Sequence, residues 1–402
     1  MRVRNIIGQA VVGDDLFGRE YELKRLREML DQGEHVLMLA PRRVGKTSLM
    51  LELKREPPAN WEVIYVNVEG GENPTDCIAA ILASLAAIPQ YRSRFQKIPF
   101  SSAIREVLQA FQSATIDIDV LKIELRGAIG RDWDSAAAQL QARLMKLPSA
   151  QDNLLIIIDE LPVLISRMLR MPEGRNDADI LLSRLRYWRQ GPEFRGALCT
   201  LVGGSIGLEG VLRRAGLSGS INDLAPFRLE AWDPGTAVTF LKELGKTYEF
   251  ALGDNDISSI LGLLQDPVPY HVQLFFAALR DHCKGDVACV SREVIERTFS
   301  ERLAGASGTA HLDHYATRLE IALEPNEYEV ACAILDHLSR HRNGTDLRQL
   351  DTLQQQGAGV FRSVLRDLKA DSYLVEQGQL WRFRSNLLRE WWERHHHSGT
   401  SM

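Results

Sequence analysis

Residues 40–47 read APRRVGKT and match the phosphate-binding pattern G-x-x-x-x-G-K-[ST] at every defined position except the first, where Ala40 replaces glycine. Residues 35–40 form an apolar run and residues 47–56 have a helical pattern, so the loop is expected between a buried strand and a helix. In that setting, backbone N–H groups and the helix N-terminus favour a bound phosphate. Because alanine is small enough for the opening turn, we predict a nucleotide-binding loop.

Residues at the end of this loop have the properties that binding a nucleoside triphosphate needs. Gly45 lets the backbone approach a phosphate without an intervening Cβ. Lys46 would reach the β- and γ-phosphates of ATP, and the Thr47 hydroxyl would bind Mg²⁺. The predicted nucleotide-binding residues of the stretch are Ala40, Pro41, Arg42, Arg43, Val44, Gly45, Lys46, Thr47 and Ser48.

An acidic pair, Asp159 and Glu160, follows the apolar run at residues 154–158. Asp159 would hold Mg²⁺, directly or through water, and Glu160 would act as the general base that polarises an attacking water. An acidic cap on an ordinary strand is the alternative for the pair taken alone. Ser205 follows the next apolar strand pattern and would contact the γ-phosphate or the water, unless it is an ordinary loop serine. The predicted catalytic residues are therefore Lys46, Glu160 and Ser205.

Composition limits the class of protein. A hydrophobic fraction of 45% over 402 residues is enough for two or three domains with cores of their own. The net charge of −5 gives no general attraction to nucleic acid, so any basic surface must be local. The five cysteines include no C-x-x-C pair, which favours free thiols in a reducing compartment. Because we find neither a signal peptide nor an apolar run long enough for a bilayer, we expect a cytoplasmic protein without membrane contact.

Short apolar runs alternate with helical patterns over the first 232 residues. The predicted strands lie at 35–40, 63–69, 153–160, 196–205 and 227–232. This alternation predicts an α/β fold in which helices cover both faces of a parallel sheet. Residues 116–130, IDIDVLKIELRGAIG, have an alternating pattern that suggests a hairpin or strand insertion.

The pattern changes after residue 232, and we divide the chain accordingly. Residues 1–231 are predicted to form the nucleotide-binding core, and residues 232–304 a small helical lid. Residues 305–326 would connect this lid to a winged helix at 327–402, where three helices, a hairpin with Gly378 at its turn and a last helix are expected. Trp391 and Trp392 would pack within that last helix. His395–His397 would bind metal incidentally or form a frayed end.

Several stretches together resemble one known group, the archaeal-type ATPases of the STAND clade, which are related to AAA+ proteins and to Orc/Cdc6 initiators. The resemblance extends from about residue 14 to residue 280, and the terminal winged helix also fits the group. The stretches are FGRE at 17–20, APRRVGKTSL at 40–49, LLIIIDELP at 154–162, LVGGS at 201–205 and DPVPYHVQLFF at 266–276.

The resemblance implies further site residues and departs from the group at two points. Phe17, Gly18 and Arg19 would lie near the adenine, while Pro269 and Tyr270 would close over the base or ribose. Pro267 stands where the group has a glycine. No arginine occupies the position of the group's second sensor, and His271 is either a substitute for it or a packed core histidine.

An arginine finger would reach the γ-phosphate of a neighbouring subunit. Arg42 and Arg43 resemble the paired arginines of the group and would face the γ-phosphate, a partner or solvent. The other candidates flank the fourth strand and have solvated helix faces as their alternative: Arg184, Arg186, Arg189, Arg195, Arg213 and Arg214.

The C-terminal residues 327–397 contain ten basic and ten acidic side chains and are neutral as a whole. Within them, Arg362, Arg366 and Lys369 share one face of a predicted helix, and Arg382 and Arg384 flank the hairpin strand. Such a face would contact DNA phosphates in a winged helix. An ordinary solvated face on a packing domain is the alternative.

These observations favour an ATP-binding and ATP-hydrolysing switch that uses ATP and Mg²⁺ and controls a DNA- or protein-dependent process. The alternative from another class is a winged-helix DNA-binding adaptor that uses nucleotide only to set its conformation. A third hypothesis is a scaffold whose partner docks on the insertion near residues 116–130. We find no protease-like catalytic arrangement, and we expect a separately encoded effector and a homo-oligomer.

Overall fold

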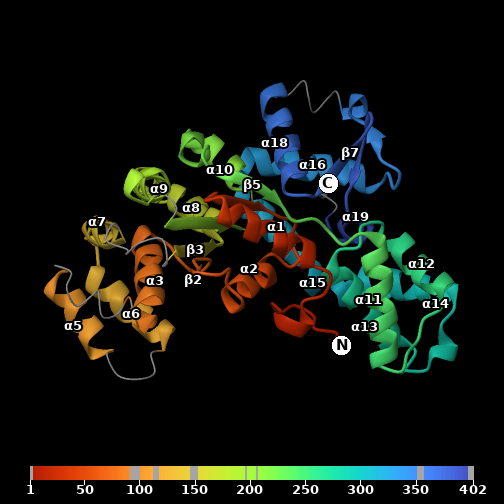
Figure 1. Cartoon of the computed structure of the whole chain (residues 1–402). Coiled ribbons are helices and arrows are strands. Elements are labelled where there is room, and N and C mark those ends of the chain that lie inside the picture. The colour runs from red at the N-terminus through yellow and green to blue at the C-terminus, as the bar shows by residue number, and fades with distance from the viewer. Residues whose placement is uncertain are drawn as a thin grey trace.

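The centre of the molecule is a five-stranded parallel sheet (Figure 1). The structure is a computed structural model and describes residues 3–89, 91, 100–111, 117–144, 153–194, 197–204, 207–350 and 357–396. The strands follow the order β2-β3-β4-β1-β5 across the sheet. Their bounds are β1 (Val36–Leu39), β2 (Trp61–Asn67), β3 (Asn153–Asp159), β4 (Leu198–Gly203) and β5 (Ala225–Arg228). The predicted α/β fold with a parallel sheet is confirmed.

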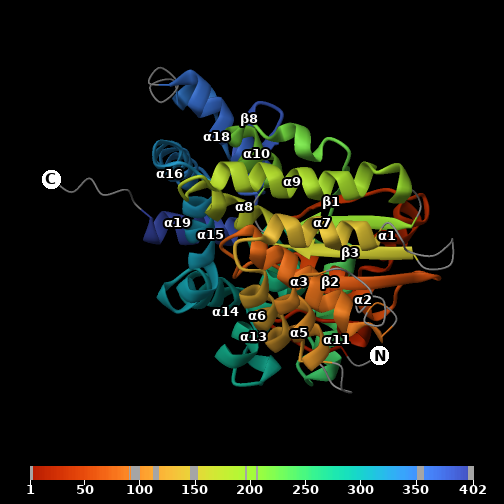
Figure 2. The same ribbon diagram turned by 90° about the vertical axis from the view of Figure 1, so that its left-hand side faces the viewer.

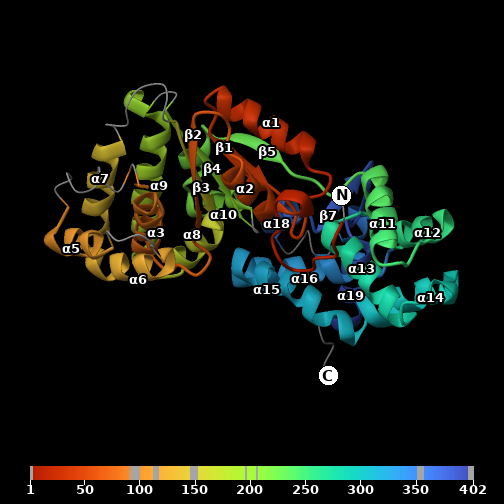
Figure 3. The same ribbon diagram turned by 60° about the horizontal axis from the view of Figure 1, so that its bottom comes forward.

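Helices precede and connect these strands. Some of them, α3, α5, α6 and α7, extend beyond the β2 edge of the sheet, as Figures 1 and 3 show. The bounds are α1 (Glu20–Asp31), α2 (Lys46–Arg55), α3 (Pro74–Ala87), α5 (Ser102–Ala110), α6 (Ile118–Ile129), α7 (Trp133–Leu144), α8 (Leu161–Leu169), α9 (Gly174–Gln190) and α10 (Leu208–Ala215).

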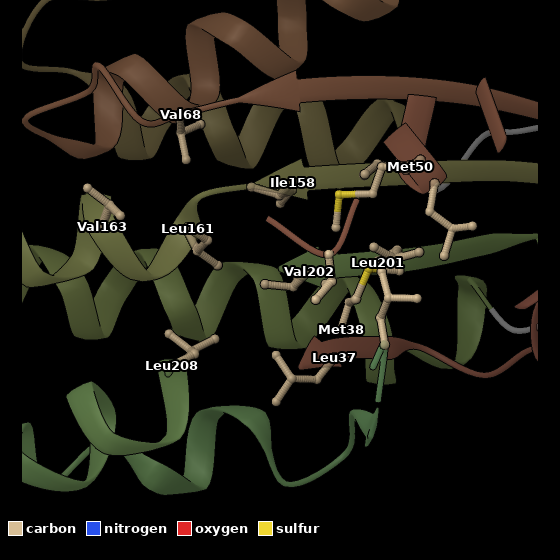
Figure 4. Close-up of a cluster of buried hydrophobic side chains, with 14 of the residues drawn as sticks. Leu37, Met38, Met50, Val68, Ile158, Leu161, Val163, Leu201, Val202 and Leu208 are labelled. Atoms are coloured by element: carbon tan, nitrogen blue, oxygen red, sulfur yellow. The ribbon is translucent and has the colours of Figure 1, made fainter. Parts of the chain in front are cut away.

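The core explains why β3 is a continuous apolar run and not an alternating one. Residues 154–158 are at most 1% exposed, since each face of a parallel sheet is covered by helices. Figure 4 shows Ile158 of β3 and Val202 of β4 among side chains from helices, including Met50 of α2 and Leu161 of α8. Each fully buried aliphatic side chain of this kind contributes about 1.5–3 kcal/mol to stability. The carboxyl ends of β1, β3 and β4 are thereby held at one edge.

The prediction of a hairpin or strand insertion at 116–130 is wrong, because the described part of this stretch forms α6. The Asp117 side chain caps the helix by accepting hydrogen bonds from the backbone N–H groups of Asp119 and Val120. Leu121, Leu125 and Ile129 recur at intervals of four and are all buried. Helical spacing of the buried residues therefore outweighs the alternating pattern near Ile118. Ile116 lies outside the described residues.

The fifth strand begins and ends earlier than the predicted 227–232. The backbone N–H of Leu229 still bonds the Leu39 carbonyl, but three residues later the N–H of Trp232 bonds the Pro267 carbonyl instead. The indole of Trp232 also packs on the rings of Phe17 and Phe240, 6.0 and 4.7 Å away between centres. The chain leaves the sheet here because the next helical segment offers a partner for this aromatic side chain.

The remaining chain forms a helical segment and a C-terminal segment (Figure 1). The helical segment consists of α11 (Pro234–Thr247), α12 (Asp254–Leu264), α13 (Pro269–His282), α14 (Arg292–Arg297) and a π-helical turn, Thr298–Leu303. It is followed by α15 (Thr309–Ala322). The C-terminal segment consists of α16 (Pro325–Ser339), β6 (Thr345–Asp346), a 3₁₀ turn (Leu347–Leu350), α18 (Ala358–Ala370), β7 (Leu374–Gln377), β8 (Leu380–Phe383) and α19 (Asn386–His395).

The C-terminal segment is built on the predicted hairpin and last helix. Strands β7 and β8 form the hairpin, and β6 adds a third strand in the order β6-β8-β7. Trp391 and Trp392 are fully buried, as predicted, and the Trp392 indole N–H donates to Asp336 Oδ1 at 2.7 Å. The ring of His396 lies 4.6 Å from that of Trp392, so this part of the chain end is packed. His397 lies outside the described residues.

The C-terminal segment contacts the sheet domain through α18 and α10, which Figure 2 shows side by side. Asp367 of α18 accepts from Arg213 at 2.7 Å and from Arg214 at 2.5 Å. Burial, and then the neighbouring Asp367 carboxylate, raise the pKa of Asp371 to about 7. The backbone N–H of Gly207 and the charge of Arg214 oppose this rise, while Glu209 adds to it. The contact therefore includes a carboxyl that resists ionisation.

We expect Asp371→Asn to stabilise the protein at pH 8 and progressively less at lower pH. A carboxyl with a raised folded-state pKa binds its proton more tightly in the folded than in the unfolded chain, so ionisation costs stability as pH rises from about 4 to about 7. Because the residue keeps some solvent exposure, the expected gain at pH 8 is about 1–2 kcal/mol. Urea unfolding between pH 5 and pH 8 measures it. A gain that is the same at all pH values, or an equal gain for the exposed Asp313→Asn, would contradict the prediction.

Among the described residues, no helix is long and apolar enough to cross a membrane.

Candidate nucleotide-binding site

The predicted phosphate-binding loop lies directly between β1 and α2, in the strand–loop–helix setting that the motif requires. Arg43 and Gly45 have positive φ angles of 67° and 98°, so the backbone turns sharply twice before Lys46 begins α2. Turns of this kind gather backbone N–H groups into anion-binding concavities. A Cβ built on Gly45 would meet no heavy atom within 4 Å. The loop thus presents open space where a phosphate would lie.

The acidic pair lies next to this loop, because β3 is separated from β1 only by β4 and all three strands are parallel, so their carboxyl ends lie at the same edge of the sheet. The Lys46 ammonium donates to Asp159 Oδ1 at 2.6 Å and to Glu160 Oε1 at 2.8 Å. The Thr47 hydroxyl donates to Asp159 Oδ2 at 2.9 Å. Lys46, Asp159 and Glu160 are all less than 10% exposed. The structure therefore brings the four residues with predicted phosphate, metal and general-base roles within hydrogen-bond distance.

The backbone positions the two carboxylates differently. Glu160 has a φ of 64° and precedes the first residue of α8, so the chain turns sharply at the end of the strand. Asp159 Oδ1 also accepts the backbone N–H of Glu160 at 3.0 Å. The Asp159 carboxylate is thereby fixed by several donors.

Tyr65 of β2 belongs to this cluster, although the sequence analysis did not identify it. Its hydroxyl donates to Asp159 Oδ2 at 3.0 Å. Burial and the Asp159 charge raise the pKa of Tyr65 well above its ordinary value, so the hydroxyl keeps its proton. The sequence offered only a tyrosine within a predicted strand, 63–69, with no sign of which strand would adjoin it.

A cleft of about 370 Å³ opens from the loop toward the helical segment. The N-terminal stretch around residues 4–11 forms one wall of this cleft, and it is hydrogen-bonded to both α2 and α13. The backbone N–H of Val11 donates to Ser48 Oγ at 3.0 Å, and that of Ile6 donates to Gln273 Oε1 of α13 at 2.9 Å. This N-terminal wall was not predicted, because its residues carry no motif.

The residues that the resemblance placed near the adenine differ in whether they are available to a ligand or engaged in packing. Phe17 lines the cleft, and its ring centre lies 5.2 Å from that of Phe240. Gly18 is packed against α11, where an added Cβ would lie 2.4 Å from Thr236 Cγ2. Gly18 also has a positive φ of 63°. Gly18 is thus required for the close contact between this turn and α11.

Arg19 is almost completely buried, and its side chain links two separate segments of the chain. Its guanidinium donates to the carbonyl oxygens of Val44 and Glu230, each at 2.8 Å, and pairs with Glu22. Burial lowers the pKa of Arg19, and the Glu22 carboxylate opposes that effect. Arg19 lines the cleft, but its hydrogen bonds hold the phosphate loop to the chain that follows β5.

Pro269 and Tyr270 begin α13 and line the cleft opposite the loop. The Arg43 guanidinium lies 4.5 Å from the centre of the Tyr270 ring, a cation–π contact between the loop and the helical segment. His271 is fully buried, and burial lowers its pKa to about 3. It is therefore a neutral core histidine and not a charged substitute for an arginine.

Most arginine-finger candidates are engaged within the chain. Arg184 pairs with Asp134 at 2.8 Å, and Arg189 pairs with Asp223 at 2.6 Å. Arg186 donates to the Gly219 carbonyl, while Arg213 and Arg214 pair with Asp367. Arg195 lies outside the described residues. Arg42 and Arg43 are the candidates that line the cleft.

Ser205 lies outside the described residues, so its predicted contact with the γ-phosphate is not placed. Its neighbour Gly204 lines the cleft and packs so closely on Pro162 that an added Cβ would lie 2.5 Å from Pro162 Cδ. The end of β4 therefore reaches the same cleft as the ends of β1 and β3.

Comparisons with known proteins give structural matches only. No protein-family model and no curated protein sequence matches the chain. It is similar to a Walker-type ATPase of Pyrococcus abyssi, with a TM-score of 0.60 and 19% identity over 96% of this chain and 98% of that chain. It also matches the ORC2 protein of Aeropyrum pernix in ADPNP–ADP complexes, with a TM-score of 0.49 and 14% identity over 94% of each chain. The Pyrococcus likeness shows that the two chains share a fold over nearly their full length.

Proposed function

We propose that the protein binds ATP with Mg²⁺ in the cleft between the sheet and the helical segment, and that it hydrolyses the ATP. One observation carries the proposal: Lys46 and Thr47 hydrogen-bond the carboxylates of Asp159 and Glu160 at 2.6–2.9 Å, and all but Asp159 line the open cleft. This set combines a phosphate ligand, two oxygen donors for a metal and a general base.

The donor set fits Mg²⁺. Thr47 and Asp159 offer oxygen atoms only, and Mg²⁺ prefers oxygen ligands, usually one or two from protein and the rest from phosphates and water. When bound there, Mg²⁺ would neutralise charge on the β- and γ-phosphates. Lys46 would exchange its contacts with Asp159 and Glu160 for phosphate oxygens, because the triphosphate carries more negative charge.

Each residue of the site would then have its own role in hydrolysis. Once Lys46 bonds a phosphate oxygen, the Glu160 carboxylate is available to accept a proton from water. The water oxygen forms a bond to the γ-phosphorus while the bond to the ADP oxygen breaks, giving ADP and phosphate. Burial of Glu160 excludes competing water and strengthens its interaction with the attacking molecule.

The cleft walls suggest where the base would lie and how the chain is divided. We propose that Phe17, Pro269 and Tyr270 hold the adenine and ribose, because all three line the cleft and two of them are aromatic. We further propose residues 1–231 as the core, 232–304 as a lid, 305–326 as the connection and 327–402 as a winged helix. A switch that responds to ATP would move the last two parts relative to the core.

Equilibrium binding and phosphate release test the proposal directly. Titration of the full chain with ATP and ADP, in the presence and absence of Mg²⁺, should show binding that Mg²⁺ strengthens for ATP. Released phosphate should accumulate with time and stop when EDTA is added. A protein that binds neither nucleotide at millimolar concentration would refute the proposal.

A DNA-binding adaptor remains the second candidate, favoured by the exposed face of α18. Arg362 and Arg366 are exposed, and neither makes an ion pair with a described residue. Lys369 of the same face is partly neutralised, because it pairs with Glu376 at 2.6 Å. Of the two arginines expected to flank the hairpin strand, Arg384 pairs with Asp266 and Glu230, and Arg382 donates to Gln377 and to the Phe383 carbonyl. The candidate DNA surface therefore rests mainly on two arginines.

If α18 contacts DNA, Arg362→Ala with Arg366→Ala should weaken duplex binding for all sequences. The slope of log affinity against log salt concentration is negative, and each lost phosphate contact should make it shallower by about 0.9, because fewer counterions are released. Fluorescence anisotropy with a labelled duplex at several salt concentrations measures both effects. The matched control replaces Arg292 and Arg297, two exposed arginines of α14. Equal losses in both double variants would point to nonspecific attraction only.

A homo-oligomer, a separately encoded effector and a cytoplasmic location stay predictions.

A further inference from the structure

Helix α15 brings an arginine into the nucleotide cleft from outside the sheet and the helical segment. Arg318 is 9% exposed and lines the cleft together with Glu160, Gly204 and the phosphate loop. Its guanidinium pairs with Glu69, which follows the end of β2. Neither residue belongs to a motif, and the sequence analysis identified neither.

A second arginine, Arg42, makes no ion pair with any residue that the structure describes. Arg42 of the phosphate loop lines the same cleft, and its Nη1 atom is buried without a hydrogen-bond partner among the described residues. Burial, and then the positive charge of Arg318, lower the pKa of Arg42. Its other titratable neighbours are Arg43, His314 and the buried phenols of Tyr315 and Tyr373, and burial keeps both phenols protonated. A buried cation of this kind is stabilised by an anion, which the cleft has room to admit.

The position of Arg318 is tied to the acidic pair. The last carbonyl groups of α15 accept hydrogen bonds from α8, where Ser166 Oγ donates to Ile321 at 2.7 Å and Arg170 donates to Glu320 at 2.7 Å. Arg214 of α10 donates to the Ala322 carbonyl. Cations at a helix C-terminus satisfy the unpaired carbonyls and the helix dipole. Arg318 therefore lies about one turn from a helix end that is fixed to α8, which begins directly after Glu160.

We propose that Arg318 and Arg42 together contact the terminal phosphate of a bound nucleoside triphosphate, and that Glu69 competes with this phosphate for Arg318. The contact would let the site distinguish a triphosphate from a diphosphate, which lacks the group that the two arginines reach. Since α15 leads directly into α16, the same contact would report the terminal phosphate to the C-terminal segment. This inference rests on the proposed nucleotide site and adds a residue that acts in the same chain, not from a neighbouring subunit.

The test compares affinities for a non-hydrolysable β,γ-imido analogue of ATP and for ADP, both with Mg²⁺, by isothermal titration calorimetry. Arg318→Gln should lower affinity for the triphosphate roughly 10- to 100-fold, the usual effect of losing a charged hydrogen bond, while affinity for ADP stays within about twofold. Arg318→Lys should recover part of the loss. Glu69→Gln should raise triphosphate affinity about two- to fivefold, because it removes the competitor.

The matched control is Glu320→Gln, an exposed charge change on the same helix, which should alter neither affinity. An equal loss for both nucleotides in Arg318→Gln, or no loss, would overturn the proposal. If circular dichroism shows that this variant does not fold, Glu69→Gln decides, and an unchanged triphosphate affinity is then the overturning result. Failure of the parent protein to bind either nucleotide would refute the nucleotide site itself. This outcome differs from failure of the Arg318 proposal, in which the parent protein binds both nucleotides.

Discussion

Replacement of Glu160 by Gln is expected to reduce ATP turnover roughly 10²- to 10⁴-fold, the usual contribution of a positioned general base. Glutamine keeps the size of the side chain and an oxygen that can accept from Lys46, but it cannot take a proton from water. ATP affinity should therefore change little, since in the proposed site Lys46 binds the phosphates and Glu160 contacts only the attacking water. Single-turnover phosphate release measures the catalytic step, and calorimetric titration measures binding separately.

The exposed Glu72→Gln is a suitable control, because it removes an acidic side chain beyond the end of β2 without touching the phosphate loop. It should leave turnover unchanged. Turnover that survives Glu160→Gln would exclude Glu160 as the base. If the parent protein binds ATP but releases no phosphate, the protein is a nucleotide-binding adaptor, and the second proposed function gains support.

Replacement of Lys46 by Ala should lower affinity for both ATP and ADP roughly 100-fold or more, because it removes a buried charged partner of the phosphates. The same change leaves the carboxylates of Asp159 and Glu160 without their shared ammonium group. Breaking a buried ion pair in this way commonly costs about 3–5 kcal/mol of stability. The variant should therefore unfold at a lower temperature, and ATP should no longer raise its melting temperature.

Lys54→Ala is the matched control, since Lys54 is an exposed lysine on the same helix. It should bind nucleotide like the parent. Lys46→Ala leaves two carboxylates without a cation, and adding Glu160→Gln removes the charge of one of them. This double variant should therefore recover part of the lost stability without recovering ATP binding. Parent-like ATP affinity in a folded Lys46→Ala protein would show that the nucleotide site has been assigned wrongly.

Two contacts that bear on the proposed switch lie at different places. Arg318 of α15 reaches the nucleotide cleft, whereas Asp367 of α18 pairs with Arg213 and Arg214 of α10. A change of nucleotide that moved Arg318 would also disturb α15, whose C-terminal carbonyl Ala322 is held by Arg214. Arg214 thus connects both contacts, which gives the proposed switch a physical route from the cleft to α18.

The sequence by itself determined the parallel sheet and the strand–loop–helix setting of the phosphate loop, because both depend on short-range pattern, although it placed the fifth strand a few residues too late. A buried strand must be apolar on both faces, and a phosphate loop needs Gly45, Lys46 and Thr47 at fixed spacing. The helical nature of residues 118–129 was missed, since alternation near the start of that stretch concealed the four-residue spacing of Leu121, Leu125 and Ile129.

Only the tertiary structure decided which distant side chains meet at the cleft. Arg318 and Glu69 are separated by 249 positions, and Tyr65 and Asp159 by 94, so no local pattern relates them. Arg19 likewise links the phosphate loop to the chain after β5, because the carbonyl groups to which it donates belong to two separate parts of the sequence. Local spacing is set by backbone geometry, whereas pairing between such distant positions depends on how the whole core packs, and a single sequence does not display that packing.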